Sequence, residues 1–304
     1  MKGGFQQSVG DRMGQAREKI ELRTMRSEDI PPVLELINIE GWEYEMVDIE
    51  RILDVDPENS IVALVGDEVV GLITAACHKN RGVLGHVVVK KGWRKAGIGK
   101  KMMVEVLRRL DAARIGIVEL YSVPDAMEFY RKLGFRKISD LRIYKGDVKN
   151  RIPVQSSRAE IRNLNGRDLA AVIEMDRRVS GFDRSNVIEK LMMPCLRSSI
   201  GLFEGGKLAG FALGRAAELE AEIGPWIMER PNREEGAAMI MATMDAMSNR
   251  RSFIEIPGEN PLANSIIVDL GFEPKADVHR FVRTALDIPK FGPGVMSYAA
   301  LEFG

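Results

Sequence analysis

Hydrophobic and polar positions follow two different periods along this chain. Short runs of apolar residues, as at 61–65 and 83–90, are typical of buried strands. Residues 101–110 instead place apolar side chains three and four positions apart, which is the spacing of one helix face. The resulting order is strand, helix, hairpin, strand, helix, strand, helix, strand, and this order then repeats. The pattern therefore predicts an α/β (α+β) fold with mixed sheets and flanking helices.

Three segments of the first half of the chain recur in the second half. The matched pairs are Asp29 with Asp168, Gly71 with Gly210, and Tyr130 with Ile267, in segments 20–37 and 159–176, 61–76 and 200–215, and 125–135 and 263–272. Matched positions lie 139, 139 and 137 residues apart. Any two α/β domains share an order of elements, but the shared Gly and Leu-Gly-Phe registers favour an internal duplication.

Local signals place the elements within each copy of the repeat. We expect the first helix of each copy to be capped by Asp29 or Asp168, or by Ser27 in the first copy. Segments 61–76 and 200–215 each hold a tight Gly turn between two apolar strands, which predicts a hairpin.

The length of 304 residues fits two domains. The repeat places the first domain at 20–148 and the second at 159–304, with a polar, Pro-containing linker at 149–158. Residues 1–19 are polar and rich in Gly and Gln, without the apolar core of a signal peptide. We expect them to form a flexible lead of a cytoplasmic protein.

Composition excludes several classes of function. Lys plus Arg equal Asp plus Glu at 44 each, so no basic excess points to nucleic acid. No apolar run is long enough to span a bilayer. The two cysteines, Cys77 and Cys195, lie far apart, which supports neither a disulfide framework nor a metal site. We expect a monomer or homodimer that binds no metal, membrane or nucleic acid.

The stretch from 83 to 110 carries the strongest chemical signal. A β-branched strand precedes Arg94-Lys95-Ala96-Gly97-Ile98-Gly99, and a helix follows. Glycines allow close approach of the backbone, and a helix N-terminus favours negative charge. The stretch therefore predicts a phosphate or pyrophosphate site, with a simple Gly turn as the alternative. It is not a Walker loop, because no Ser or Thr follows Lys100.

Arg94-x-x-Gly97-x-Gly99 and the later stretch DAMEFYRKLGF (125–135) together resemble the GNAT superfamily of acyl-CoA-dependent N-acyltransferases. The resemblance implies a mixed, splayed central sheet flanked by helices in each copy, and acetyl-CoA as co-substrate. It also assigns cofactor contacts to the strand and the loop, namely Val87, Val88, Val89, Arg94, Lys95, Ala96, Gly97, Ile98, Gly99 and Lys100. The pattern departs at Val123, where relatives often have an Asn that bonds the pantetheine.

The resemblance also implies a general acid. Tyr130 stands where the family places a tyrosine that protonates the departing CoA thiolate. The alternative is a purely structural role, in which Tyr130 is a half-buried aromatic ring that anchors its helix.

Candidates for the base and the acceptor site lie earlier in the first copy. His86 is a possible base, although strand alternation turns it off the expected face unless a bulge rotates it. The alternative is a packed core histidine. Relatives cover the acceptor pocket with the segment that here holds Trp42, Glu43, Glu45 and Asp48, which suits a cationic amine. The same residues also fit a solvated acidic helix with one packed Trp.

The second copy lacks the chemical features of the first. Glu234 and Glu235 stand at the expected helix N-terminus and would repel a pyrophosphate, and Ile267 has no proton to donate. Asn260 restores the Asn that is Val123 in the first copy. The copy resembles the degenerate half of tandem GNAT proteins, in which Asp176, Arg184 and Trp226 belong to recurring motifs. We interpret these three as acceptor-pocket or interdomain residues, with simple core packing as the alternative.

The resulting prediction is an acetyl-CoA-dependent N-acetyltransferase, an acyltransferase that transfers groups other than aminoacyl groups. A small-molecule or peptide primary amine would attack the thioester directly in a ternary complex, because no Cys or Ser nucleophile motif is present. Two alternatives stay open at this point. One is a non-catalytic acyl-CoA-sensing protein. The other is a tandem GNAT aminoacyltransferase, which the neutral charge disfavours.

Overall fold

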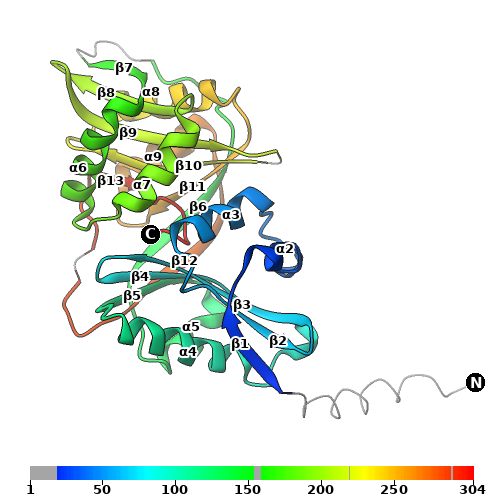
Figure 1. The fold of residues 1–304 in the computed structure, drawn as a ribbon. Helices are drawn as coiled ribbons and strands as arrows, with labels where there is room; N and C mark the ends of the chain where they lie inside the picture. Colours follow the sequence, from blue (N-terminus) through cyan, green and yellow to red (C-terminus); the bar gives the residue numbers. More distant parts are fainter. Residues whose placement is uncertain (1–18, 154–158, 219, 289) are drawn as a thin grey trace, which may run out of the picture. The chain divides into compact units, whose positions relative to one another are not determined.

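A computed structural model describes residues 19–153, 159–218, 220–288 and 290–304 (Figure 1). The predicted lead at 1–19 therefore lies almost wholly outside the described residues, as does half of the predicted linker at 149–158. Within the described ranges, no helix has the length and apolarity needed to cross a membrane.

The chain divides into two compact units. Unit 1 holds the chain up to Ala75 together with His86–Ala113, and unit 2 holds Ala76–Gly85 together with Arg114–Gly304. Two strands, β3 (Glu68–His78) and β4 (Arg81–Val89), pass from one unit to the other.

In its described residues, unit 1 contains an antiparallel sheet and three α-helices. Strands β1 (Ile20–Thr24), β2 (Ile61–Val65) and β3 pair in that order, as the predicted hairpin at 61–76 requires. Its helices are α2 (Ile30–Asn38), α3 (Met46–Val55) and α4 (Ile98–Ala112). Helix α4 packs against β2 and buries the apolar face that its spacing predicted, including Met102, Met103, Val106 and Leu110.

Unit 2 is built on a long mixed sheet with the order β4-β5-β12-β6-β11-β10-β9-β8-β7, and β13 pairs with β10. Its strands are β5 (Ile117–Ser122), β6 (Arg136–Gly146), β7 (Glu160–Asn163), β8 (Ser199–Glu204), β9 (Lys207–Ala216), β10 (Ala221–Met228), β11 (Ser252–Pro257), β12 (Glu273–Arg283) and β13 (Val295–Ser297). Its helices are α5 (Met127–Arg131), α6 (Leu169–Ser180), α7 (Ser185–Met192), α8 (Arg233–Ala246) and α9 (Pro261–Leu270). Strand β9 is buried from Ala209 to Arg215 without alternation, because helices cover both of its faces.

The two copies exchange their last strands. Strand β12, which ends the second copy, lies between β5 and β6 and pairs antiparallel with both (Figure 1). In return β6, which ends the first copy, pairs antiparallel with β11. The last strand of each copy therefore pairs with the fifth strand of the other copy.

Equivalent contacts in the two copies confirm the repeat. A Cβ built on Gly71 would lie 2.8 Å from Met102 Cε, and one on Gly210 would lie 3.4 Å from Met239 Sδ. In both copies the glycine thus lets a methionine of the long helix approach the hairpin closely. A second equivalent contact lies at the Leu-Gly-Phe segments, where Phe135 N donates to Tyr130 O at 3.1 Å in the first copy.

The same bond recurs in the second copy, where Phe272 N donates to Ile267 O at 3.1 Å. Tyr130 and Ile267 therefore occupy the same place before the same helix stop. The predicted register of Leu-Gly-Phe is confirmed.

The predicted helix caps take a different form from the one expected. A 3-10 turn (Ser27–Asp29) precedes α2, and neither Ser27 nor Asp29 makes a capping bond to that helix. Asp29 instead accepts from Arg26 N at 2.8 Å and binds the Arg23 guanidinium at 2.7 and 2.8 Å. In the second copy, Asp168 binds Arg162 in the same two-pronged way at 2.9 and 3.0 Å.

Candidate functional site

The predicted anion site is formed by the end of β4 and the start of α4. The backbone turns left-handed at Lys95 (φ 68°) and at Gly97 (φ 80°), which directs successive N–H groups of the loop to one side. No side chain caps α4, and its first turn holds no acidic residue. The first N–H groups of a helix have no intrahelical partner, so this end favours an anion.

Arg94 is held in two directions. Its Nε donates to Val89 O at 2.9 Å, and its Nη2 forms an ion pair with the Glu40 carboxylate. The loop from Arg94 to Gly97 is exposed, while Val87 and Val89 are half-buried. Strand β4 pairs with β5 only as far as Leu84, so the backbone of Val87–Val89 continues beyond that pairing.

The matching helix of the second copy has a closed N-terminus. Asn232 Oδ1 accepts from Glu235 N at 2.9 Å, which satisfies a donor that α4 leaves open. Glu234 and Glu235 add negative charge in the first turn of α8. The predicted loss of an anion site in the second copy agrees with this geometry.

His86 interrupts β4 just before the valines. Its φ of 45° is left-handed, which a non-glycine residue in a strand rarely adopts. The left-handed backbone is a local irregularity of the kind that a bulge makes, although half-buried and buried positions still alternate from Gly85 to Val89. The imidazole Nδ1 lies 2.9 Å from Thr74 Oγ1.

Two aromatic rings cover His86. The Tyr44 ring stands edge-on at 4.5 Å between centroids, and the Trp42 ring lies tilted at 5.9 Å. The His86 side chain is only 7% exposed, and this burial lowers its pKa to about 3. The imidazole is therefore neutral at physiological pH.

The connection between α2 and α3 presents the rings. Asn38, the last residue of α2, donates to Tyr44 O and accepts from Tyr44 N, both at 2.9 Å. Glu45 and Asp48 form a capping box at the start of α3, in which Asp48 Oδ2 accepts from Glu45 N at 2.9 Å. Glu43 adopts a left-handed φ of 55°. A role of these three acidic residues in acceptor binding stays a prediction.

Tyr130 belongs to unit 2. Its ring packs against Phe129, Phe135 and Phe281, with centroids 5.2 to 6.4 Å apart. Burial raises the pKa of the phenol to about 12, so the hydroxyl keeps its proton at neutral pH. Helix α5 around it has five residues, and a 3-10 turn (Pro124–Ala126) leads directly into it.

Sequence and structure comparisons identify the family. Profiles of the acetyltransferase (GNAT) domain match residues 22–149 and, through a second profile, residues 172–291. This chain belongs to the GNAT acetyltransferases. It carries two such domains in tandem.

Similar proteins support the same conclusion. The uncharacterized N-acetyltransferase YitH of Bacillus subtilis is 21% identical over 260 residues, which cover 83% of this chain and 87% of YitH. A protein of Pyrococcus horikoshii assigned as an acetyltransferase has a TM-score of 0.77 at 19% identity, with 94% and 96% of the two chains covered. A tandem GNAT protein from the clavulanic acid biosynthesis pathway has a TM-score of 0.66 at 15% identity, with 89% and 100% covered.

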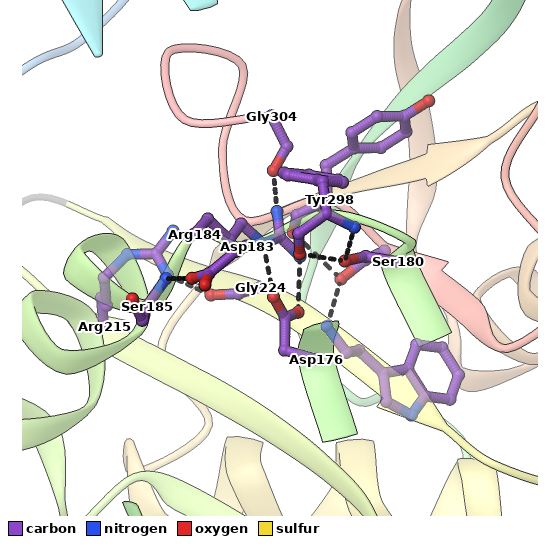
Figure 2. A network of polar contacts seen from close by, with 12 residues as sticks. Asp176, Ser180, Asp183, Arg184, Ser185, Arg215, Gly224, Tyr298 and Gly304 are labelled. Atoms are coloured by element: carbon purple, nitrogen blue, oxygen red, sulfur yellow. Dashed lines mark hydrogen bonds and ion pairs between the residues drawn. The ribbon is translucent and has the colours of Figure 1, made fainter. Parts of the chain in front are cut away.

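Two of the three residues predicted from the second copy of this GNAT protein, Asp176 and Arg184, lie in a buried polar network (Figure 2). Arg184 donates to both carboxylate oxygens of Asp176, at 3.0 and 2.9 Å, and also to the carbonyl oxygen of Gly304. Trp226 is fully buried, and its backbone N–H donates to Ser297 Oγ at 2.9 Å. These contacts hold unit 2 together. A role in acceptor binding stays a prediction.

A buried glutamate recurs in both copies and was not found from the sequence. Glu119 on β5 lies between Arg81 and Arg280, which binds it at 2.9 and 3.1 Å. Burial acts to raise the Glu119 pKa, but the two arginines outweigh it and hold the pKa at about 2.

The equivalent residue on β11 is Glu255, which has two carboxylates and Arg215 near it in place of two arginines. Arg81 pairs with Ile117, two residues before Glu119, and Glu222 pairs with Phe253, two residues before Glu255. Glu222 therefore takes the place of Arg81 in the strand register. Burial and the nearby Glu222 and Glu302 raise the pKa of Glu255 well above its ordinary value. The only signal in the sequence was the shared Val/Ile-Glu-Leu/Ile pattern.

Proposed function

We propose that this protein is an acetyl-CoA-dependent N-acetyltransferase that acylates a primary amine by direct transfer. The observation that carries the proposal is the open N-terminus of α4, which follows the part of β4 that belongs to unit 1 (residues 86–89). A pyrophosphate suits this end of α4 for two reasons. The backbone is left-handed at Lys95 and Gly97, and the first turn of α4 holds no acidic residue. The second copy serves as scaffold in this proposal, because its α8 end is capped and acidic.

Named residues would hold the cofactor. The loop from Arg94 to Lys100 would bind the pyrophosphate, and the backbone of Val87–Val89 would bind the pantetheine amides. Bound acetyl-CoA supplies the activated thioester. No metal is needed in this scheme, since the thioester carbonyl is already electrophilic.

The proton transfers fall to His86 and Tyr130. The amine nitrogen attacks the thioester carbonyl, and the carbon–sulfur bond breaks. Neutral His86 accepts the proton that the nitrogen loses. Burial in the closed arrangement lowers its pKa to about 3 and so weakens it as a base, and contact with the amine relieves that burial. Tyr130 donates its proton to the leaving thiolate. No covalent intermediate with the protein is required.

The connection around Trp42 supports an acceptor with an apolar framework. Four large hydrophobic side chains within nine residues are between 41% and 50% exposed, namely Ile39, Trp42, Met46 and Val47. Acidic residues alternate with them, which favours a cation over a neutral or acidic group. We therefore propose an amine attached to an apolar or aromatic group.

Thiol release from acetyl-CoA tests the proposal. Matched acceptors are 2-phenylethylamine, ethylamine and ethanolamine, together with a panel of amino acids and short peptides. Amine-dependent release, fastest for the aromatic amine, is the expected result. Binding of acetyl-CoA with no release for any amine would instead favour an acyl-CoA sensor. Transfer from aminoacyl-tRNA alone would favour the aminoacyltransferase.

A further inference from the structure

The ion pair between Glu40 and Arg94 joins the two sides of the proposed site within unit 1. Arg94 belongs to the anion loop, and Glu40 lies in the connection 39–45 between α2 and α3. The same connection carries Trp42 and Tyr44, whose rings cover His86. One short segment therefore contacts both the arginine expected to meet the cofactor and the proposed base.

The base is closed off in this arrangement. His86 is 7% exposed beneath the two rings, so an amine can reach the imidazole only after the connection moves. Backbone bonds at both ends also hold the connection. They run from Ile39 N to Glu35 O at 3.1 Å, Glu40 N to Ile37 O at 3.0 Å, Gly41 N to Asn38 O at 2.9 Å and Glu45 N to Asp48 Oδ2 at 2.9 Å, in addition to the two bonds between Asn38 and Tyr44. Glu40 adds the bond to the anion loop.

A pyrophosphate competes with Glu40 for the guanidinium. Phosphate oxygens bind arginine through charge-assisted, often paired hydrogen bonds, and they carry more charge than one carboxylate. Arg94 already uses Nε on Val89 O and Nη2 on Glu40. If Arg94 turns to the pyrophosphate, Glu40 loses its partner. If Glu40 stays, its charge opposes the pyrophosphate, so in either case the carboxylate weakens cofactor binding.

We propose that the Glu40–Arg94 ion pair couples acyl-CoA binding to opening of the 39–45 connection. The cofactor takes Arg94, Glu40 is released, and the connection loosens so that His86 becomes accessible to the amine. Coupling is reciprocal, so if the cofactor weakens the ion pair, the ion pair weakens cofactor binding by the same factor. Removing the Glu40 charge must then strengthen cofactor binding by that factor. The proposal rests on the proposed function of the site.

Calorimetric titration with CoA tests the competition. Glu40→Gln should lower the Kd for CoA by about two- to fivefold, the size expected of an exposed ion pair. Glu35→Gln is the matched control, because it removes the same charge from the exposed face of the preceding helix without touching Arg94. In an Arg94→Ala background the gain from Glu40→Gln should vanish.

Hydrogen exchange of the 39–45 connection tests the opening. In the wild-type protein, CoA should increase exchange of the Gly41 and Tyr44 amides. In Glu40→Gln these amides should exchange fast without CoA, and CoA should add little. Slower exchange in the wild type on adding CoA, or an equal or weaker CoA affinity of Glu40→Gln, would overturn the coupling but leave the proposed function standing. Absence of any CoA binding to the wild type would overturn both.

Discussion

Tyr130 keeps its proton across the usual assay range, because burial raises its pKa to about 12. Tyr130→Phe preserves the ring that packs against Phe135 and Phe281 but removes the hydroxyl. We expect turnover to fall by about tenfold or more while the Kd for CoA stays the same, as for loss of a general acid. Thiol release and calorimetry measure the two quantities.

The matched control is Tyr144→Phe. Tyr144 is another buried phenol, and its hydroxyl donates to Asn264 at 2.7 Å. This variant should lose stability but not turnover. Unchanged turnover in Tyr130→Phe would show that Tyr130 only packs.

His86 should stay neutral well below neutral pH while the connection covers it. Its pKa of about 3 in this state means that kcat/KM has no inflection from His86 near pH 6.5. His86→Gln should lower turnover by about tenfold or more with CoA affinity unchanged. An inflection near pH 6.5 that disappears in His86→Gln would contradict the burial of this imidazole.

Glu255 should make the protein less stable at alkaline pH. Burial and the carboxylates of Glu222 and Glu302 raise its folded pKa above the unfolded value of 4.5, so the folded state binds more protons between the two values. Stability is therefore lost as pH rises through that window. Arg215, which pairs with Glu222 at 2.5 Å, offsets part of this effect. Melting temperatures from pH 5 to 9 should fall more steeply in the wild type than in Glu255→Gln.

Glu119→Gln provides the contrast for this experiment. Glu119 has a folded pKa of about 2, so it is charged and paired throughout pH 5 to 9. Its replacement should lower the melting temperature at every pH. Parallel curves for the wild type and Glu255→Gln would refute the raised pKa.

The sequence could single out His86 and Tyr130 as candidates, but it could not predict the residues that surround them. Thr74 lies twelve residues before His86, and Tyr44 lies more than forty before it, so only strand register and the α2–α3 connection bring them together. Glu40 and Arg94 meet for the same reason. The spacing of hydrophobic and polar residues along the chain does not predict such long-range pairs.

Helices α4 and α8 occupy equivalent places in the repeat but differ at their N-termini. The open end of α4 should bind one CoA, whereas the Asn232 cap and the acidic turn of α8 should exclude a second. Calorimetry should therefore give one site per chain. Lys100→Glu should weaken binding, and Glu234→Lys should leave it unchanged. Two sites per chain, or sensitivity to Glu234→Lys, would contradict the closed state of α8.

The elements themselves were largely predictable, because each has a local cause. Apolar runs on both sides of a Gly turn marked the hairpins, and the 3.6-residue spacing marked α4 and its buried face. The expected caps were wrong because arginines of β1 and β7 bind Asp29 and Asp168 from the side. The contacts that a side chain makes across a turn cannot be predicted from the order of residue types along the chain.

The exchange of strands makes the whole molecule depend on both copies. A repeat read from sequence suggests two self-contained halves, yet β12 separates β5 from β6, and β6 lies against β11. Local patterns mark these segments as strands but leave open which neighbour each one takes. The partner is decided by packing over the full chain.

Cleavage between the copies tests this dependence. A protease site inserted between residues 153 and 159 would cut the backbone without removing any described strand. We expect the two fragments to elute together in gel filtration under native conditions and to separate only in denaturant, because the β5–β12, β12–β6 and β6–β11 pairings all cross the cut. An inserted Gly-Ser segment of equal length controls for the insertion. Fragments that separate without denaturant, each with its own melting transition, would show that the halves fold independently.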